Sequence, residues 1–278
     1  MVTRLAGAAT RAFLVMVLVA VPSAILPGIG TDTKQMVALV ALFAAALTFA
    51  EYNATFPGLV EFRDAPPFNR IRYATLFAIV FTLSMVASAK TSDAALPRLF
   101  EALAVLIGHA LDFPYSPVRL ATLMMAEGAS PEQMLAVRTA AGTAYILSLI
   151  ALAFFVLIFK LHGWPGRHQA FNVWVNLPTF EPTAGGDVVD RLERDARANL
   201  ALGVLLSFLI PAVVSFGSMG FRPLTLTSPQ TLIWTMTAWA FLPVSLLMRG
   251  IAMGRIASMI REKRAHNEAI SGAVAAAH

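Results

Sequence analysis

The stretch TAAGTAYILSLIALAFFVLIF, residues 139–159, decides the fold class, because it contains no Asp, Glu, Lys, Arg or His. A helix needs about 20 mostly apolar residues to cross the hydrocarbon core of a bilayer. The other stretches that lack all five residue types over a comparable length are 12–30, 35–50, 73–89, 198–219 and 230–248. We therefore predict an all-α, polytopic transmembrane helix bundle of six spans.

The composition of the whole chain agrees with a membrane protein. Hydrophobic residues make up 58% of the 278 residues and charged residues only 13%, and the mean hydropathy is +0.70. A soluble domain carries about 25% charged residues, so an ordinary soluble enzyme or a nucleic-acid-binding domain is excluded. The chain has no cysteine, which removes disulfides, thiolate nucleophiles and thiolate metal sites.

The basic residues predict the orientation of the spans, because Lys and Arg gather on the cytoplasmic side of membrane proteins. With six spans and a cytoplasmic N-terminus, 15 of the 21 basic residues fall on the cytoplasmic side. A seven-span alternative that adds 94–112 reverses this bias if the N-terminus stays inside. We therefore expect a multi-pass protein of the inner membrane of a bacterial cell, with both termini cytoplasmic and the lipid bilayer as its surroundings. Residues 1–254 form its single membrane domain, and 255–278 form a basic, Ala-rich cytoplasmic tail.

The first apolar segment has a second interpretation. Arg4 and Arg11 precede it, and the run AVPSA at 20–24 loosely resembles the cleavage region of a signal peptide. The apolar stretch continues to Gly30, and Pro22 lies inside the possible cleavage site. An uncleaved helix is therefore the favoured interpretation.

Residues 91–138 form the largest segment on the outer side, and we predict amphipathic helices there. At about 100° per residue, one narrow arc of a helix over 94–112 carries an outer polar stripe. The stripe consists of Arg98, Glu101, His109 and Asp112. Such a helix either lies on the membrane surface or dips against the bundle. Ser130-Pro131-Glu132-Gln133 is typical of a helix start with a capping box, so the next helix is expected to run unbroken into 139–159.

The segment 51–72, EYNATFPGLVEFRDAPPFNRIR, is the most distinctive loop of the chain. Its three prolines and one glycine forbid a continuous helix. One interpretation is a tight turn at the lipid headgroups. The other is a docking element for a second protein, because aromatic and Arg side chains are typical of interface hot spots. The candidate partner-binding residues are Glu51, Tyr52, Phe62, Arg63, Asp64, Phe68, Asn69, Arg70 and Arg72.

Residues 187–197 predict a helical extension ahead of the span 198–219. Asp187–Arg191, Asp190–Arg194 and Glu193–Arg197 are acid-first pairs at i,i+4, the order that stabilises a helix. Ion pairing within this helix is the expected role of these charges.

No motif for phosphate binding, serine hydrolysis, zinc proteolysis or haem attachment is found in the chain. The spans contain no ionisable residue, although ion-coupled transport and intramembrane catalysis usually need one. We therefore predict no catalytic residue, no metal, no cofactor and no nucleic-acid partner. The favoured function is a non-catalytic accessory, assembly or scaffolding subunit that binds other membrane-protein subunits. The alternatives are a transporter or channel for a small neutral or lipid-like solute, and a membrane-interface enzyme using the outer stripe or the polar residues of 51–72.

Overall fold

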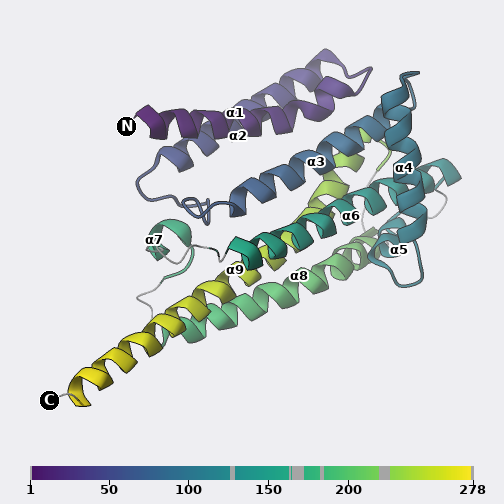
Figure 1. The fold of residues 1–278 in the computed structure, drawn as a ribbon. Coiled ribbons are helices and arrows are strands. Elements are labelled where there is room, and N and C mark those ends of the chain that lie inside the picture. The colour runs from purple at the N-terminus through teal and green to yellow at the C-terminus, as the bar shows by residue number, and fades with distance from the viewer. Residues whose placement is uncertain are drawn as a thin grey trace.

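The structure is a computed structural model that describes residues 2–125, 129–162, 164, 172–181, 185–218 and 226–276, and all regular secondary structure in these ranges is helical. Figure 1 shows long helices lying roughly side by side, with α4 crossing their direction. The helices are α1 (Val2–Ile25), α2 (Thr31–Asn53), α3 (Phe68–Ser88), α4 (Ala95–Leu111), α5 (Pro117–Thr122), α6 (Pro131–His162), α7 (Val173–Asn176), α8 (Val188–Ser218) and α9 (Pro229–Ala276).

Six of these helices, α1, α2, α3, α6, α8 and α9, are long and apolar enough to cross a membrane. The predicted helical bundle is therefore confirmed. Helix α4 has 17 residues and packs across α3 and α6, so the segment 94–112 lies against the bundle. Both ends of the chain lie at the same end of the bundle (Figure 1), as an even number of spans requires.

Several helix boundaries differ from the apolar stretches. Helix α1 ends at Ile25, before Gly28, whose φ of 74° is a conformation that glycine adopts at little cost. Helices α6 and α8 begin well before their apolar stretches, and α9 runs on through the predicted tail to Ala276. The yellow C-terminal part of α9 projects beyond the other helices (Figure 1). Arg167 and Arg222, which contributed to the predicted charge distribution, lie outside the described residues.

The predicted capping box at the start of α6 is present. The backbone N–H of Gln133 donates to Ser130 Oγ over 3.2 Å, and the backbone N–H of Ser130 donates to Gln133 Oε1 over 2.9 Å. Each bond satisfies a backbone donor that the first turn of a helix leaves open. Helix α6 then continues without a break into the apolar stretch 139–159, as predicted.

The core divides into two clusters at the two ends of the bundle. We call the end that carries the 54–67 loop and α7 the loop end, and the end that carries α4 and α5 the opposite end. The loop-end cluster includes Phe62, Phe68, Phe155, Trp164 and Met248. The opposite-end cluster is built mainly from aliphatic side chains of α1, α3, α6 and α9, together with Trp239.

The extension at the start of α8 is helical as predicted, and two of its acidic side chains pair with arginines of α9. Arg264 of α9 donates to Asp187 Oδ2 over 2.6 Å, and Arg261 of α9 contacts the carboxylate of Glu193. The hydrogen bond from Arg264 holds the pKa of Asp187 below its usual value, and the backbone N–H of Val189 adds to this effect. The two helices are therefore joined by charge beyond their apolar segments.

Candidate functional site

The 54–67 loop is held by hydrogen bonds from its own predicted site residues. The carboxylate of Glu51 accepts from the backbone N–H groups of Gly58, Leu59 and Val60 over 3.0, 2.8 and 3.1 Å. Arg63 Nη1 donates to the backbone carbonyls of Glu51 and Ala54 over 3.2 and 2.6 Å, and so caps the C-terminus of α2. The charged groups of Glu51 and Arg63 therefore both bind backbone groups of this chain.

Phe62 and Phe68, predicted as partner-binding aromatics, are buried in the loop-end cluster and are each 1% exposed. Their ring centroids lie 4.2 Å apart, and Trp164 lies 5.8 Å from Phe62. The indole N–H of Trp164 donates to the carbonyl of Pro66 over 3.0 Å. In this conformation these two rings fill the core, and a partner cannot reach them.

Glu61 is the residue of this loop that sequence reasoning missed. Arg249 of α9 binds its carboxylate with two hydrogen bonds, Nε to Oε2 over 2.6 Å and Nη2 to Oε1 over 2.9 Å. The amide of Asn69 donates to the carbonyl of Glu61 over 2.7 Å, and Thr179 Oγ1 donates to its carboxylate over 2.7 Å. The signal in the sequence was Arg249, the single arginine at the end of the last apolar stretch. A cation at that position favours an acidic partner at the same depth.

The short helix α7 completes the loop end. The backbone N–H groups of Phe62 and Asp64 donate to the carbonyl and the side-chain oxygen of Asn176 over 2.6 and 3.0 Å. The Asp64 carboxylate is exposed and lies 3.2 Å from Arg63 Nε. Contacts between distant parts of the chain therefore hold the loop end together.

Tyr52, Arg70 and Arg72 are the predicted site residues that this network leaves beside open space. Together with Arg11 of α1 they line a pocket of about 450 Å³ between α1, α2, α3 and α9. The Arg11 guanidinium lies over the Tyr52 ring, 4.7 Å from its centroid.

The outer polar stripe on α4 does not form one site. Arg98 contacts the carboxylate of Asp93, and His109 Nδ1 lies 3.4 Å from Arg138 Nη1. The Asp112 side chain is 5% exposed, and its two oxygens lie 2.7 Å from Arg119 Nε and from Arg138 Nε, without aligned hydrogen bonds among the described residues. Among the described residues, no group of three His, Asp or Glu side chains is placed to hold a metal ion. Asp112, at the end of α4, therefore joins this helix to α5 and α6 by charge.

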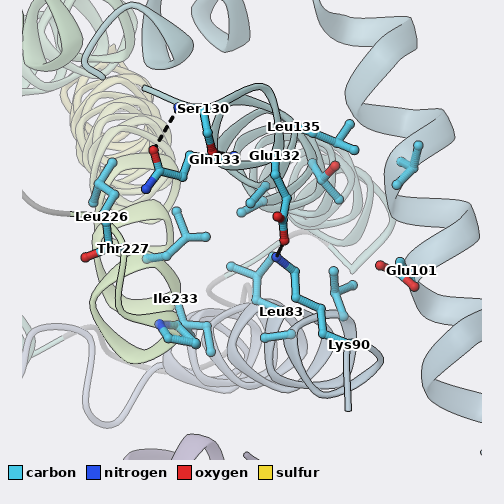
Figure 2. Close-up of a pocket in the computed structure, with 18 residues that line it drawn as sticks. Leu83, Lys90, Glu101, Ser130, Glu132, Gln133, Leu135, Leu226, Thr227 and Ile233 are labelled. Carbon is cyan, nitrogen blue, oxygen red and sulfur yellow. Dashed lines mark hydrogen bonds and ion pairs between the residues drawn. The ribbon is translucent and has the colours of Figure 1, made fainter. Parts of the chain in front are cut away.

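The remaining stripe residue, Glu101, lines a pocket of about 510 Å³ at the opposite end, between α3, α4, α6 and α9. Figure 2 shows Lys90 and Glu132 facing each other at this pocket, with Nζ 3.0 Å from Oε1. The capping pair Ser130 and Gln133 lies beside them. Apolar side chains such as Leu83 and Ile233 line the remaining wall. The pocket combines a polar rim with an apolar wall, as small-molecule sites do.

Helix α2 is the least buried span. It contacts α1 and no other described helix. Only 6% of its apolar window is buried, against 17% to 56% for the other five spans. Its exposed large side chains are Met36, Leu39, Val40, Leu42, Phe43, Leu47 and Phe49.

Comparison with protein-family models, with curated proteins and with solved structures finds no match for this chain. Function is therefore inferred from the contacts, burial and charge of this chain alone. The features that bear on it are the exposed face of α2 and the two pockets at the two ends of the bundle.

Proposed function

We propose that this multi-pass membrane protein is a non-catalytic accessory, assembly or scaffolding subunit of a larger membrane complex. The observation that carries the proposal is the isolation of α2, which packs on α1 alone and leaves its other faces open. In the 54–67 loop, Phe62, Glu61 and Arg63 contact other parts of this chain, and we therefore propose the exposed face of α2 as the docking element.

The pattern of α2 supports a helix with two packing faces. The side toward α1 includes the buried Ala41, with the half-buried Val37 and Thr48 one and two turns away. At 100° per residue, the opposite side carries an exposed stripe with alternating spacings of three and four. This stripe consists of Met36, Leu39, Phe43, Ala46 and Ala50. Such spacing suits a helical partner, and small residues such as Ala let two helices approach closely in a membrane.

A photo-crosslinking amino acid placed in α2 tests the proposal in native membranes. Phe43 and Leu39 are 72% and 68% exposed, and Val213 of α8 is a matched control at 66%. We expect a discrete adduct with another protein at 39 and 43 and only lipid adducts at 213. Lipid adducts alone at all three positions contradict the proposal.

A second candidate, a transporter for a small neutral solute, is favoured by three buried hydroxyls of α6. The hydroxyls of Thr139, Thr143 and Ser148 have no hydrogen-bond partner within the part of the chain that the structure describes. Hydroxyls in other helices bond to their own backbone, as Thr75, Ser84 and Thr237 do over 2.7 Å. Thr139 lines the pocket at the opposite end, and Thr143 lies one turn further along the same face of α6, whereas Ser148 lies on the other side of the helix.

Cysteine accessibility tests this second candidate cleanly, because the natural chain has no cysteine. We expect Thr139→Cys and Thr143→Cys to react with a water-soluble thiol reagent at decreasing rates, and the buried control Thr75→Cys to stay unlabelled. Equal protection of position 143 and the control removes the transporter candidate.

A further inference from the structure

The pocket of about 450 Å³ at the loop end carries three cationic side chains, Arg11, Arg70 and Arg72. Among the described residues that line it there is no Asp or Glu. Arg11 and Arg70 are exposed, and Arg72 is half-buried. A neighbouring pocket differs, because there Arg63 is already paired with Asp64. Among the described residues, no Asp or Glu forms an ion pair with any of the three arginines, so an anion from outside the chain has three cations to bind.

Among the three arginines, Arg72 has the strongest need for a bound anion. Its Nε is buried and has no hydrogen-bond partner among the residues that the structure describes, and its Nη1 lies 3.5 Å from Asn69 Oδ1. The guanidinium is flanked by the rings of Phe68 and Phe241, 5.4 and 5.8 Å from their centroids. Glu61, whose charge also acts on Arg72, is bound by two hydrogen bonds to Arg249. A cation withdrawn from water without a bound counter-ion is costly, and a ligand anion removes that cost.

The depth of the lining residues indicates what kind of anion fits. The Tyr73 hydroxyl donates to the carbonyl of Leu14 over 2.9 Å, which places α3 beside α1 one turn below Arg11. Leu18 and Leu76 line the pocket another turn deeper, about 5 Å further into the bundle. The pocket is therefore cationic at its mouth and apolar below, as an amphiphile with a charged head requires.

We propose that this pocket binds an anionic phospholipid from the leaflet at the loop end. The phosphate lies between Arg70, Arg72 and Arg11, where guanidinium groups bind phosphate oxygens in pairs. An acyl chain descends along Leu14, Leu18 and Leu76, between the α1–α2 hairpin and α3. The position suits the general preference of basic pockets between membrane helices for anionic headgroups.

The proposal is tested by lipid retention. The protein is reconstituted in bilayers of equal parts phosphatidylglycerol and phosphatidylcholine, extracted gently, and its bound lipids are counted by native mass spectrometry. The wild type retains phosphatidylglycerol selectively. Arg70→Gln and Arg72→Gln each weaken this selectivity about five-fold, which equals the ~1 kcal/mol that one basic residue contributes at an anionic membrane surface. The control Lys263→Gln removes a charge from the exposed part of α9 and leaves the selectivity unchanged.

Two further arms separate the alternatives. Leu76→Trp fills the apolar part of the pocket without changing its charge, and it lowers phosphatidylglycerol retention if an acyl chain occupies that space. Because Arg70 is exposed, Arg70→Gln is expected to fold even if Arg72→Gln does not. The proposal is overturned if Lys263→Gln and Arg70→Gln have equal effects, or if the wild type retains both lipids equally. Displacement of the bound lipid by inorganic phosphate, with no effect of Leu76→Trp, also overturns it and assigns the pocket to small anions.

Discussion

The two ends of the bundle are held together in different ways. At the loop end, aromatic rings and hydrogen bonds from five segments interlock around Phe62 and Glu61. At the opposite end, α4 and α6 meet through two glycines, and a Cβ added to Gly142 would lie only 2.7 Å from the Cα of Gly108. The glycine contact brings the two backbones together but supplies no side chains, and a pocket of about 510 Å³ remains beside it. The comparison teaches that interlocked side chains hold one end together and close backbone contact holds the other, while each end keeps a pocket, of about 450 and 510 Å³.

The largest expected effect comes from Phe62→Ala at the loop end. Removing a fully buried ring leaves a cavity among Phe68, Trp164 and their neighbours, and costs about 3–4 kcal/mol of unfolding free energy. Denaturant titration in detergent micelles measures the loss. The control Phe56→Ala lies in the same loop, but Phe56 is 74% exposed and its replacement should change little. Equal losses for the two variants would contradict the interlocked core.

Glu61→Gln is expected to have the next largest effect. It removes the negative charge that faces Arg249 and leaves that cation partly buried, at a cost of about 2–3 kcal/mol. Combining Glu61→Gln with Arg249→Met should recover part of the loss, because the unpaired cation is then gone. A double-mutant cycle on the unfolding free energy tests this. Strictly additive losses would show that the two side chains do not interact.

Asp112→Asn probes the opposite end and should cost less. Asp112 lies between Arg119 and Arg138 without aligned hydrogen bonds, whereas Glu61 accepts two from Arg249, so the loss is about 1 kcal/mol. The same titration measures it, with Asp93→Asn as a control at an exposed pair. A loss as large as that of Glu61→Gln would remove the contrast between the two ends.

The smallest effect is the pH dependence of the pair between Asp187 and Arg264. Since the pKa of Asp187 is lowered in the folded protein, its contribution is present above the unfolded value of 3.8 and is lost as the pH falls through the folded value. We expect wild type and Asp187→Asn to differ in thermal stability at neutral pH and to converge in acid. Thermal melts across this range measure the difference, and Arg264→Gln should reduce it. A gap that stays constant into acid contradicts the pairing.

Much of the fold is predictable from local sequence. The six apolar stretches, the start of α6 at Ser130 and the helical extension at 187–197 all depend on residues close together in the chain, and the structure has them. Helix lengths are less predictable. Helix α9 continues to Ala276 because its polar residues beyond Arg255 are compatible with a helix outside the membrane, and part of this extension packs on α8.

The candidate sites are predictable only as segments. The stretch 51–72 is distinctive in sequence, yet its composition does not separate a ring that fills a core from one that meets a partner. Phe62 and Phe56 are the same residue type in one loop, one buried and one exposed. Asp187 and Glu193 have suitable arginines four residues away, but the structure pairs them with Arg264 and Arg261 of α9.

The sequence by itself therefore determined the class of the protein, the number of its spans and the starts of several helices. These properties follow from the length of apolar runs and from capping residues, which act over a few residues. Only the tertiary structure decided which charges pair, which aromatic rings are buried and where Arg11, Arg70 and Arg72 come together. Those outcomes depend on how separate helices pack, and each is set by residues that lie far apart in the chain.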